Sequence, residues 1–154
     1  MKISELETPA LILEKKVFES NMAKMNELLK GSKMKLRPHY KSNKCPEIAK
    51  LQIAAGASGI TCAKLSEAED LAAAGIENIL IGNQVVQPSK VKRVGELAKK
   101  CYLIICVDDA DNIKALSESA VNAGSVIHCL VEYEVGMKRC GVDTYEEFLE
   151  LAKL

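Results

Sequence analysis

The segment from Arg37 to Glu47 concentrates more reactive side chains than any other stretch of this sequence. If residues 36–41 are extended, a period of two places Arg37, His39 and Lys41 on one face at the carboxyl end of a strand. Two cations and an imidazole are costly in a core and useful in an active site. Neighbouring positive charges favour the neutral amine of Lys41, the form that attacks an aldehyde. The pattern therefore indicates Schiff-base chemistry with pyridoxal phosphate as the obvious cofactor; the alternative is a lysine merely solvated at a strand end.

His39 and Arg139 are further candidates, each with a plain structural alternative. His39 could move a proton, or it could be a hydrogen-bonded residue in the wall of the site. Arg139 lies in the segment 136–142, whose glycines permit close backbone approach, and a guanidinium there could hold an anionic oxygen. The alternative for Arg139 is an ordinary surface arginine.

Polar side chains also follow the other expected strands, where sites form in proteins built from strand–helix repeats. Asn83 and Gln84 could hydrogen-bond a ring or a carboxylate, or they could cap the helix expected to begin near Pro88. The remaining polar positions of this kind are residues 61–64, Asp108, Asp109 and residues 132–139. Loops need polar residues in any case, so these positions are weaker candidates than Lys41.

The bulk composition is that of an ordinary globular domain, with 154 residues, 48% hydrophobic and 27% charged. The 21 basic residues balance the 21 acidic ones, which disfavours nucleic acid and membrane as partners and leaves a small metabolite. The six cysteines include no C-x-x-C pair, so most are expected to be reduced core residues. We find no apolar run of the signal-peptide or membrane-spanning kind and expect a cytoplasmic protein.

Short apolar runs alternate with amphipathic stretches along the chain. A helical period from Val17 to Leu29 stops at Gly31. Beyond it, strands are expected at residues 35–39, 57–62, 79–81, 103–107 and 126–131, and helices at 65–74, 91–98, 113–123 and from 145 onward. Glycines after helices, at positions 56, 75 and 124, suit left-handed C-caps. The rhythm predicts an α/β fold with parallel strands and crossover helices, either an open doubly wound sheet or a TIM-type (β/α) barrel.

About five strand–helix units fall short of the eight that a closed barrel needs, and the last helical pattern runs to Leu154 without a cap. We therefore expect residues 1–154 to be the N-terminal portion of a truncated barrel domain. The strands that usually carry phosphate-binding loops, around the seventh and eighth, would lie beyond it. Binding of a phosphorylated cofactor by these residues alone is then expected to be weak.

Several motifs occur in order and at sensible spacing along nearly the whole chain. They are Thr8–Leu11, Leu36–Ala49, Gly59–Glu69, Asn83–Val86, and Val131-Glu132 with Gly136–Val142. Together they resemble the N-terminal part of the D-threonine aldolase and D-serine dehydratase family, which belongs to the alanine-racemase-like, fold-type III pyridoxal phosphate enzymes. Any one of these motifs alone would be a weak signal.

The resemblance implies a TIM-type barrel that carries pyridoxal phosphate, followed by a β-rich C-terminal domain. The lysine of its R-P-H-x-K motif, which forms the Schiff base, corresponds to Lys41, and the arginine of G-M-x-R-C-G, beside the ring oxygen, corresponds to Arg139. Ser42 and Asn43 stand where Thr and His are usual, which leaves Lys41 unchanged and puts any role of that histidine in doubt. The family's divalent metal, zinc or manganese, is held by a His and a Cys expected outside this chain.

The implied activity is that of a pyridoxal phosphate-dependent lyase acting on 3-hydroxy D-amino acids. Loss of the Cα proton with β-elimination gives dehydration, cleavage of the Cα–Cβ bond gives a retro-aldol reaction, and racemisation is a third outcome. We expect a homodimer for the full-length protein. The alternatives to a lyase are an amino-acid racemase, a non-catalytic pyridoxal phosphate-binding protein and an inactive fragment.

Overall fold

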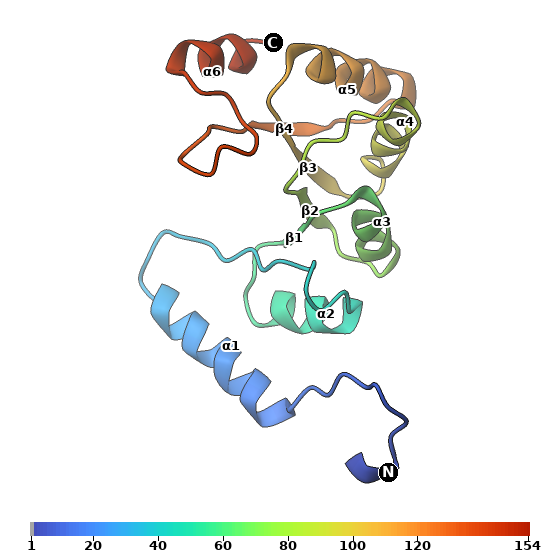
Figure 1. The fold of residues 1–154 in the computed structure, drawn as a ribbon, viewed down its shortest axis with the longest axis vertical. Helices are drawn as coiled ribbons and strands as arrows, with labels where there is room; N and C mark the ends of the chain where they lie inside the picture. Colours follow the sequence, from blue (N-terminus) through green and yellow to red (C-terminus); the bar gives the residue numbers. More distant parts are fainter. Residues whose placement is uncertain (1) are drawn as a thin grey trace. The chain divides into compact units, whose positions relative to one another are not determined.

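The first 34 residues form a unit of their own, and its main element is one helix. The computed structural model of the protein describes residues 2–154, in two units that meet between Met34 and Lys35. A short 3-10 helix, η1 (Ile3–Glu5), precedes α1 (Lys15–Leu29), drawn in blue in Figure 1. α1 confirms the helix predicted in this region, and Gly31 beyond it has a φ of 77°. No helix within residues 2–154 is long and apolar enough to cross a membrane.

The second unit is a parallel sheet whose strands follow chain order (Figure 1). The strands are β1 (Ile60–Cys62), β2 (Asn78–Ile81), β3 (Tyr102–Val107) and β4 (His128–Val131), and each pairs in parallel with the next. The helices around them are α2 (Pro46–Ala54), α3 (Leu65–Ala73), α4 (Pro88–Leu97), α5 (Ala110–Ala123) and α6 (Tyr145–Ala152). A doubly wound sheet reverses its strand order at a switch point, and this sheet does not. The unit is therefore a partial TIM-type barrel.

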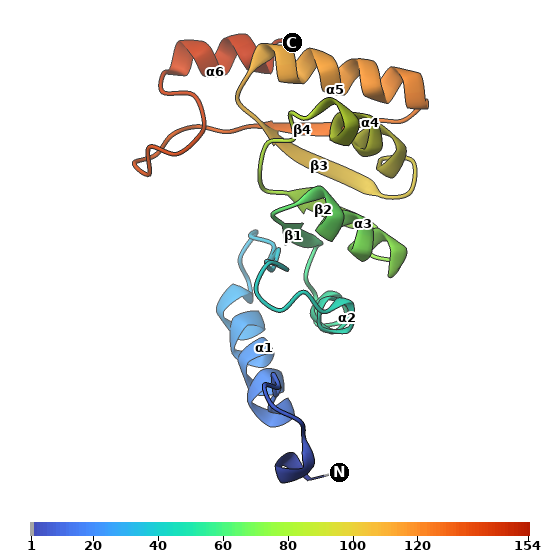
Figure 2. The same ribbon diagram turned by 45° about the vertical axis from the view of Figure 1, so that its right-hand side comes forward.

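One face of the sheet makes the core of the second unit. Ile79, Leu103 and Ile105 are fully buried, and they belong to one apolar cluster with side chains of α3, α4 and α5. Figure 2 shows these helices gathered along the strands. Leu80 and Ile104 are only half-buried because successive residues of a strand point to opposite faces. The apolar runs of the sequence therefore supply two different faces, of which the helices cover one.

A glycine lets α4 and α5 approach each other closely. A Cβ on Gly95 would lie 2.5 Å from the hydroxyl oxygen of Ser119, so a larger residue would push the helices apart. Two serine hydroxyl groups form hydrogen bonds to α4 across this close approach. Ser119 donates to the Val91 carbonyl and Ser125 donates to the Gly95 carbonyl, both at 2.8 Å. These contacts offset the low helix propensity of glycine and hold consecutive strand–helix units together.

The first expected strand does not form as a regular strand. Residues 35–40 run beside β1 and make one isolated bridge, between His39 and Thr61. Tyr40 N–H donates to the Thr61 carbonyl at 2.7 Å, and Thr61 N–H donates to the Pro38 carbonyl at 2.8 Å. The ladder does not extend further back because proline has no N–H to donate. Residues 2–154 thus contain four regular strands where about five were expected.

The six cysteines are free, but only Cys62 is buried in the core. Burial raises the pKa of the Cys62 thiol to about 12, so it stays protonated. The expectation that most of the cysteines are core residues is wrong. Cys106, for example, alternates with Ile105 and Val107 and points to the face that the helices leave uncovered.

Substituting neighbouring residues of β2 tests this one-sided burial. Ile79→Ala should lower the free energy of unfolding by about 2–5 kcal/mol, because it opens a cavity in the fully buried layer. Leu80→Ala removes a similar volume from the half-buried face and should cost clearly less. Urea unfolding followed by circular dichroism measures both. Equal losses would mean that both faces of the sheet are packed alike.

Candidate functional site

Three side chains from three successive loops meet at the carboxyl edge of the sheet. Gln84 follows β2, Asp108 follows β3 and Glu132 follows β4. Gln84 Nε2 donates to Asp108 Oδ2 at 3.0 Å and to Glu132 Oε2 at 2.8 Å. Both hydrogens of the amide are used, and two carboxylates are held on either side of it. The strand register brings these residues together, as expected where parallel strands end.

The loop after β4 folds back onto this group. Cys140 Sγ donates to Glu132 Oε1 at 3.0 Å, and Gly141 N–H donates to Asp108 Oδ2 at 3.0 Å. Gly141 has a φ of 96°, and a Cβ there would lie 3.0 Å from the Glu132 carbonyl oxygen. This close return needs glycine. The glycine-containing segment noted in the sequence therefore belongs to the same edge of the sheet as Gln84.

Arg139 is exposed in this loop, and Glu134 holds the backbone around it. The backbone N–H groups of Gly136 and Arg139 donate to the two carboxylate oxygens of Glu134, the latter at 3.1 Å. Backbone hydrogen bonds, from Lys138 and then from Gly136, hold the pKa of Glu134 below its ordinary value. The structure therefore fixes the main chain of Arg139, while its guanidinium is solvent-exposed beside Cys140.

Lys41 and His39 lie together at the end of the segment that runs beside β1. Lys41 is exposed, and its backbone N–H donates to His39 Nδ1 at 3.2 Å. Burial, and then the charge of Lys41, lowers the pKa of His39, with Glu67 acting in the opposite direction. His39 is therefore neutral at pH 7, with its hydrogen on Nε2. Within residues 2–154, no carboxylate forms an ion pair with the Lys41 ammonium.

Arg37 does not join this pair. Its guanidinium donates to Asn78 Oδ1 at 2.9 Å and to the Asn78 carbonyl at 3.4 Å. Asn78 is the first residue of β2, so Arg37 lies toward the amino end of the sheet. The expected convergence of Arg37 with His39 and Lys41 is wrong, because Asn78 holds the Arg37 guanidinium and the chain enters a turn at Lys41.

A buried carboxylate that sequence reasoning missed lies under the Lys41 segment. Glu67 is 5% exposed and accepts a hydrogen bond from Ala63 N–H at 2.9 Å. Lys44 Nζ lies 3.1 Å from its other oxygen. The signal available in the sequence was a glutamate in the first turn of a helix, where it can reach back to free backbone N–H groups. No spacing rule links Glu67 to Lys44, which comes from a different loop.

Asn83 shapes the turn after β2 and does not cap a helix. Its Oδ1 accepts a hydrogen bond from Gln84 N–H at 3.0 Å. α4 begins at Pro88 with Gln87 in the N-cap position, and no side chain makes a capping hydrogen bond there. The capping alternative for Asn83 and Gln84 is therefore wrong, and both residues remain candidates for contact with a ligand.

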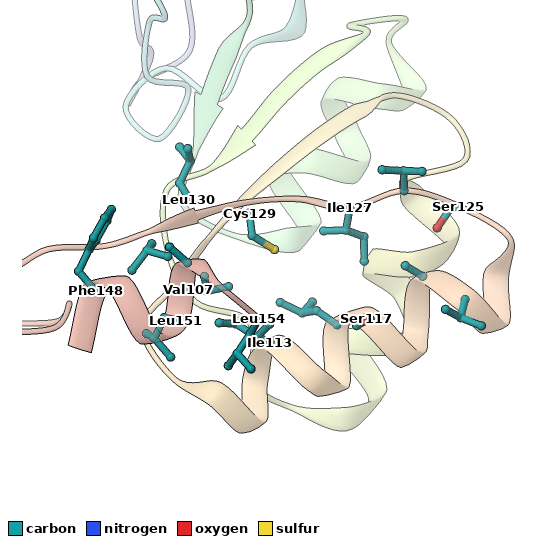
Figure 3. Close-up of a pocket in the computed structure, with 16 residues that line it drawn as sticks. Val107, Ile113, Ser117, Ser125, Ile127, Cys129, Leu130, Phe148, Leu151 and Leu154 are labelled. Carbon is teal, nitrogen blue, oxygen red and sulfur yellow. The ribbon is translucent and has the colours of Figure 1, made fainter. Parts of the chain in front are cut away.

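An apolar groove of about 640 Å³ lies apart from these polar groups. Figure 3 shows it between β4 and the helices α5 and α6, with Ile127, Leu130 and Leu151 among the side chains that line it. Its walls are almost entirely aliphatic and contain no carboxylate, imidazole or cation. The charged side chains and the imidazole singled out above are instead at the carboxyl edge of the sheet.

Known proteins resemble the chain in both sequence and structure. The alanine racemase N-terminal domain family matches residues 14–154. A D-threonine aldolase of Arthrobacter sp. is 44% identical over 98% of this chain, and a 3-hydroxy-D-aspartate aldolase of Paracoccus denitrificans is 41% identical over 99%. The crystal structure of D-threonine aldolase from Filomicrobium marinum covers 98% of this chain with a TM-score of 0.95 and 43% identity.

The match is to one part of these longer proteins. The chain spans 40% of the length of the two curated aldolases and 41% of the Filomicrobium structure. A D-threo-3-hydroxyaspartate dehydratase from Delftia sp. HT23 also has the fold, with a TM-score of 0.81 at 31% identity over 90% of this chain and 37% of that one. The partial barrel and its strand order agree with the family match. The chain therefore belongs to the alanine racemase N-terminal domain family, and D-threonine aldolases and 3-hydroxy-D-aspartate aldolases are among its homologues.

Proposed function

We propose that this chain supplies the lysine-bearing part of a pyridoxal phosphate-dependent lyase that cleaves 3-hydroxy D-amino acids. The observation that carries the proposal is Lys41, exposed at the carboxyl edge of a partial barrel, beside a neutral His39 and, in the part of the chain that the structure describes, without an ion pair to a carboxylate. Aldol cleavage is favoured over dehydration because the relatives named as aldolases are 41–44% identical, against 32% for the dehydratase. Residues 1–154 would be the N-terminal part of a barrel domain in a homodimer, followed by a β-rich domain.

The residues at this edge fit the cofactor. Within residues 2–154, Lys41 makes no ion pair with a carboxylate, whereas Lys44 is paired with Glu67, so Lys41 is the less constrained of the two amines. Lys41 would hold the cofactor covalently, and His39, Asn83, Gln84 and Arg139 would line its surroundings. When bound, pyridoxal phosphate supplies an electron sink for bonds broken at the Cα of an amino acid.

The group of Gln84, Asp108 and Glu132 determines which part of a ligand could bind beside it. Because both N–H groups of the Gln84 amide are already used, only its Oε1 is left, and this atom accepts hydrogen bonds. The two carboxylates beside it favour a cationic or N–H-bearing part of a ligand. Gln84 therefore orients a donor on the ligand and offers no donor itself. An anionic group would bind elsewhere, with the exposed Arg139 as one available cation.

Within residues 2–154, no group of three or more His, Cys, Asp or Glu side chains is placed to hold a metal ion. One solved structure of a Delftia dehydratase variant is a metal-free form, which implies that this relative also has a metal-bound form. We propose that any divalent metal of the whole enzyme has its ligands outside these residues.

Chemical trapping tests the role of Lys41. After incubation of the protein with pyridoxal phosphate, borohydride should fix a stable adduct on Lys41, which peptide mass spectrometry locates. Lys41→Ala should abolish this adduct, because the amine is lost. Lys90→Ala, which removes an exposed lysine of α4, should leave it unchanged. Adducts spread evenly over exposed lysines would contradict a specific site.

Product analysis tests the reaction. With pyridoxal phosphate and a divalent metal, the full-length enzyme that contains this chain should convert D-threonine to glycine and acetaldehyde, and L-threonine should stay intact. Ammonia released from D-serine would point to dehydration, and loss of optical activity without either product would point to racemisation. A Lys41 adduct without any of these products would mean that the protein binds the cofactor without catalysis.

A charge at Gln84 should make stability depend on pH. Gln84→Glu places a third carboxyl group between Asp108 and Glu132, so its pKa in the folded protein rises above the usual value of about 4.3. A raised pKa of an acid means that the folded state loses stability as pH rises. We expect little loss near pH 4 and a loss of about 1–2 kcal/mol at pH 8, measured by urea unfolding. Asn83→Asp, on the exposed neighbour, is the control, and the same loss at both pH values would contradict the network.

A further inference from the structure

The turn that contains Lys41 is held at both ends. On one side, Tyr40 is 3% exposed and packs in the core. On the other, Lys44 N–H donates to the Tyr40 carbonyl at 2.9 Å, which closes a single turn over residues 41–43. Lys44 adopts a left-handed backbone, with a φ of 47°, although it is not glycine. Such a conformation costs about 1 kcal/mol or more and persists only when neighbouring contacts enforce it.

Glu67 contacts the side chain of the residue that closes this turn. Its carboxylate lies 3.1 Å from Lys44 Nζ, and it also accepts the Ala63 N–H of the loop after β1. The contact brings the Lys44 ammonium to ion-pair distance of Oε1. A charge–charge contact of this kind tolerates the strained backbone, because it demands distance more than angle. Glu67 therefore ties the Lys41 turn to the end of a regular strand.

The carboxylate remains charged despite its burial. Burial alone would raise the pKa of Glu67, but the hydrogen bond from Ala63 N–H and the Lys44 ammonium together hold that pKa below its ordinary value. At neutral pH the Glu67 carboxylate is thus ionised. Removing Lys44 alone would leave a buried charge without its partner, which is the costly case for such pairs.

We propose that Glu67, acting through Lys44, is the positioning residue for Lys41. The inference rests on the proposed function in one respect, which is that Lys41 is the lysine that captures the cofactor's aldehyde. Glu67 does not touch the reacting atoms; it limits the positions that the Lys41 amine can adopt. Reaction rates depend steeply on such placement, and a misplacement of about 1 Å can cost up to two orders of magnitude.

The test follows capture of pyridoxal phosphate by the whole chain. Glu67→Gln keeps an acceptor for Ala63 N–H and removes the charge, while Lys44→Met removes the partner. Both should slow borohydride-trapped adduct formation at Lys41 about tenfold. Adduct formation at Lys90, an exposed residue of α4 measured in the same digest, should stay constant. Lys44→Arg keeps the positive charge that Lys44→Met removes, so it should retain most of the rate of adduct formation at Lys41.

The double variant Glu67→Gln/Lys44→Met separates positioning from stability. It has no unpaired buried charge, so its unfolding midpoint should return toward that of the unaltered protein, whereas Lys41 capture should stay slow. If capture recovers together with stability, Glu67 has only a structural role and the inference fails.

Hydrogen exchange gives a readout that needs no cofactor. The Lys44 amide, protected by the Tyr40 carbonyl, should exchange faster in Glu67→Gln than in the unaltered protein. Unchanged exchange in Glu67→Gln would overturn the inference. If the unaltered protein forms no adduct at Lys41, the proposed function fails instead, and the exchange result still decides whether Glu67 holds the turn.

Discussion

The parallel register of β1 to β4 is the constraint on which the rest of this structure depends. Because the strands pair in chain order, all of their carboxyl ends lie at one edge, and each following loop adds its polar residues there. The same register fixes which residues share a face. Gln84, Asp108 and Glu132 meet because the three strands before them end side by side. The backbone pairing therefore determines which side chains can interact at the site.

Much of the fold was predictable from local patterns, and the failures have local physical causes. The periods of apolar residues placed four strands and most helices correctly, because burial on one face leaves a period in the sequence. The first strand was overestimated because Pro38 cannot extend the ladder. Arg37 was placed wrongly because the alternation of side chains along a strand shows which face a residue occupies. It does not show which end of the sheet the side chain reaches.

The sequence indicated which residues belong to the candidate site better than it indicated which of them contact each other. Position after a strand was enough to select Lys41, Gln84 and Asp108. It could not show that Gln84 bridges two carboxylates, or that Glu67 pairs with Lys44, because both contacts join distant loops. Such contacts depend on the register of the whole sheet, and a single sequence holds no periodic signal for them.

The uncovered face of the sheet has an apolar middle between two polar ends. Its cross-strand row begins with His39 and Thr61, passes through Leu80 and Ile104, and ends at His128. The imidazole and hydroxyl groups at the ends can hydrogen-bond water, whereas the two aliphatic side chains between them cannot. Wetting of this face therefore separates the end nearest Lys41 from the end at β4.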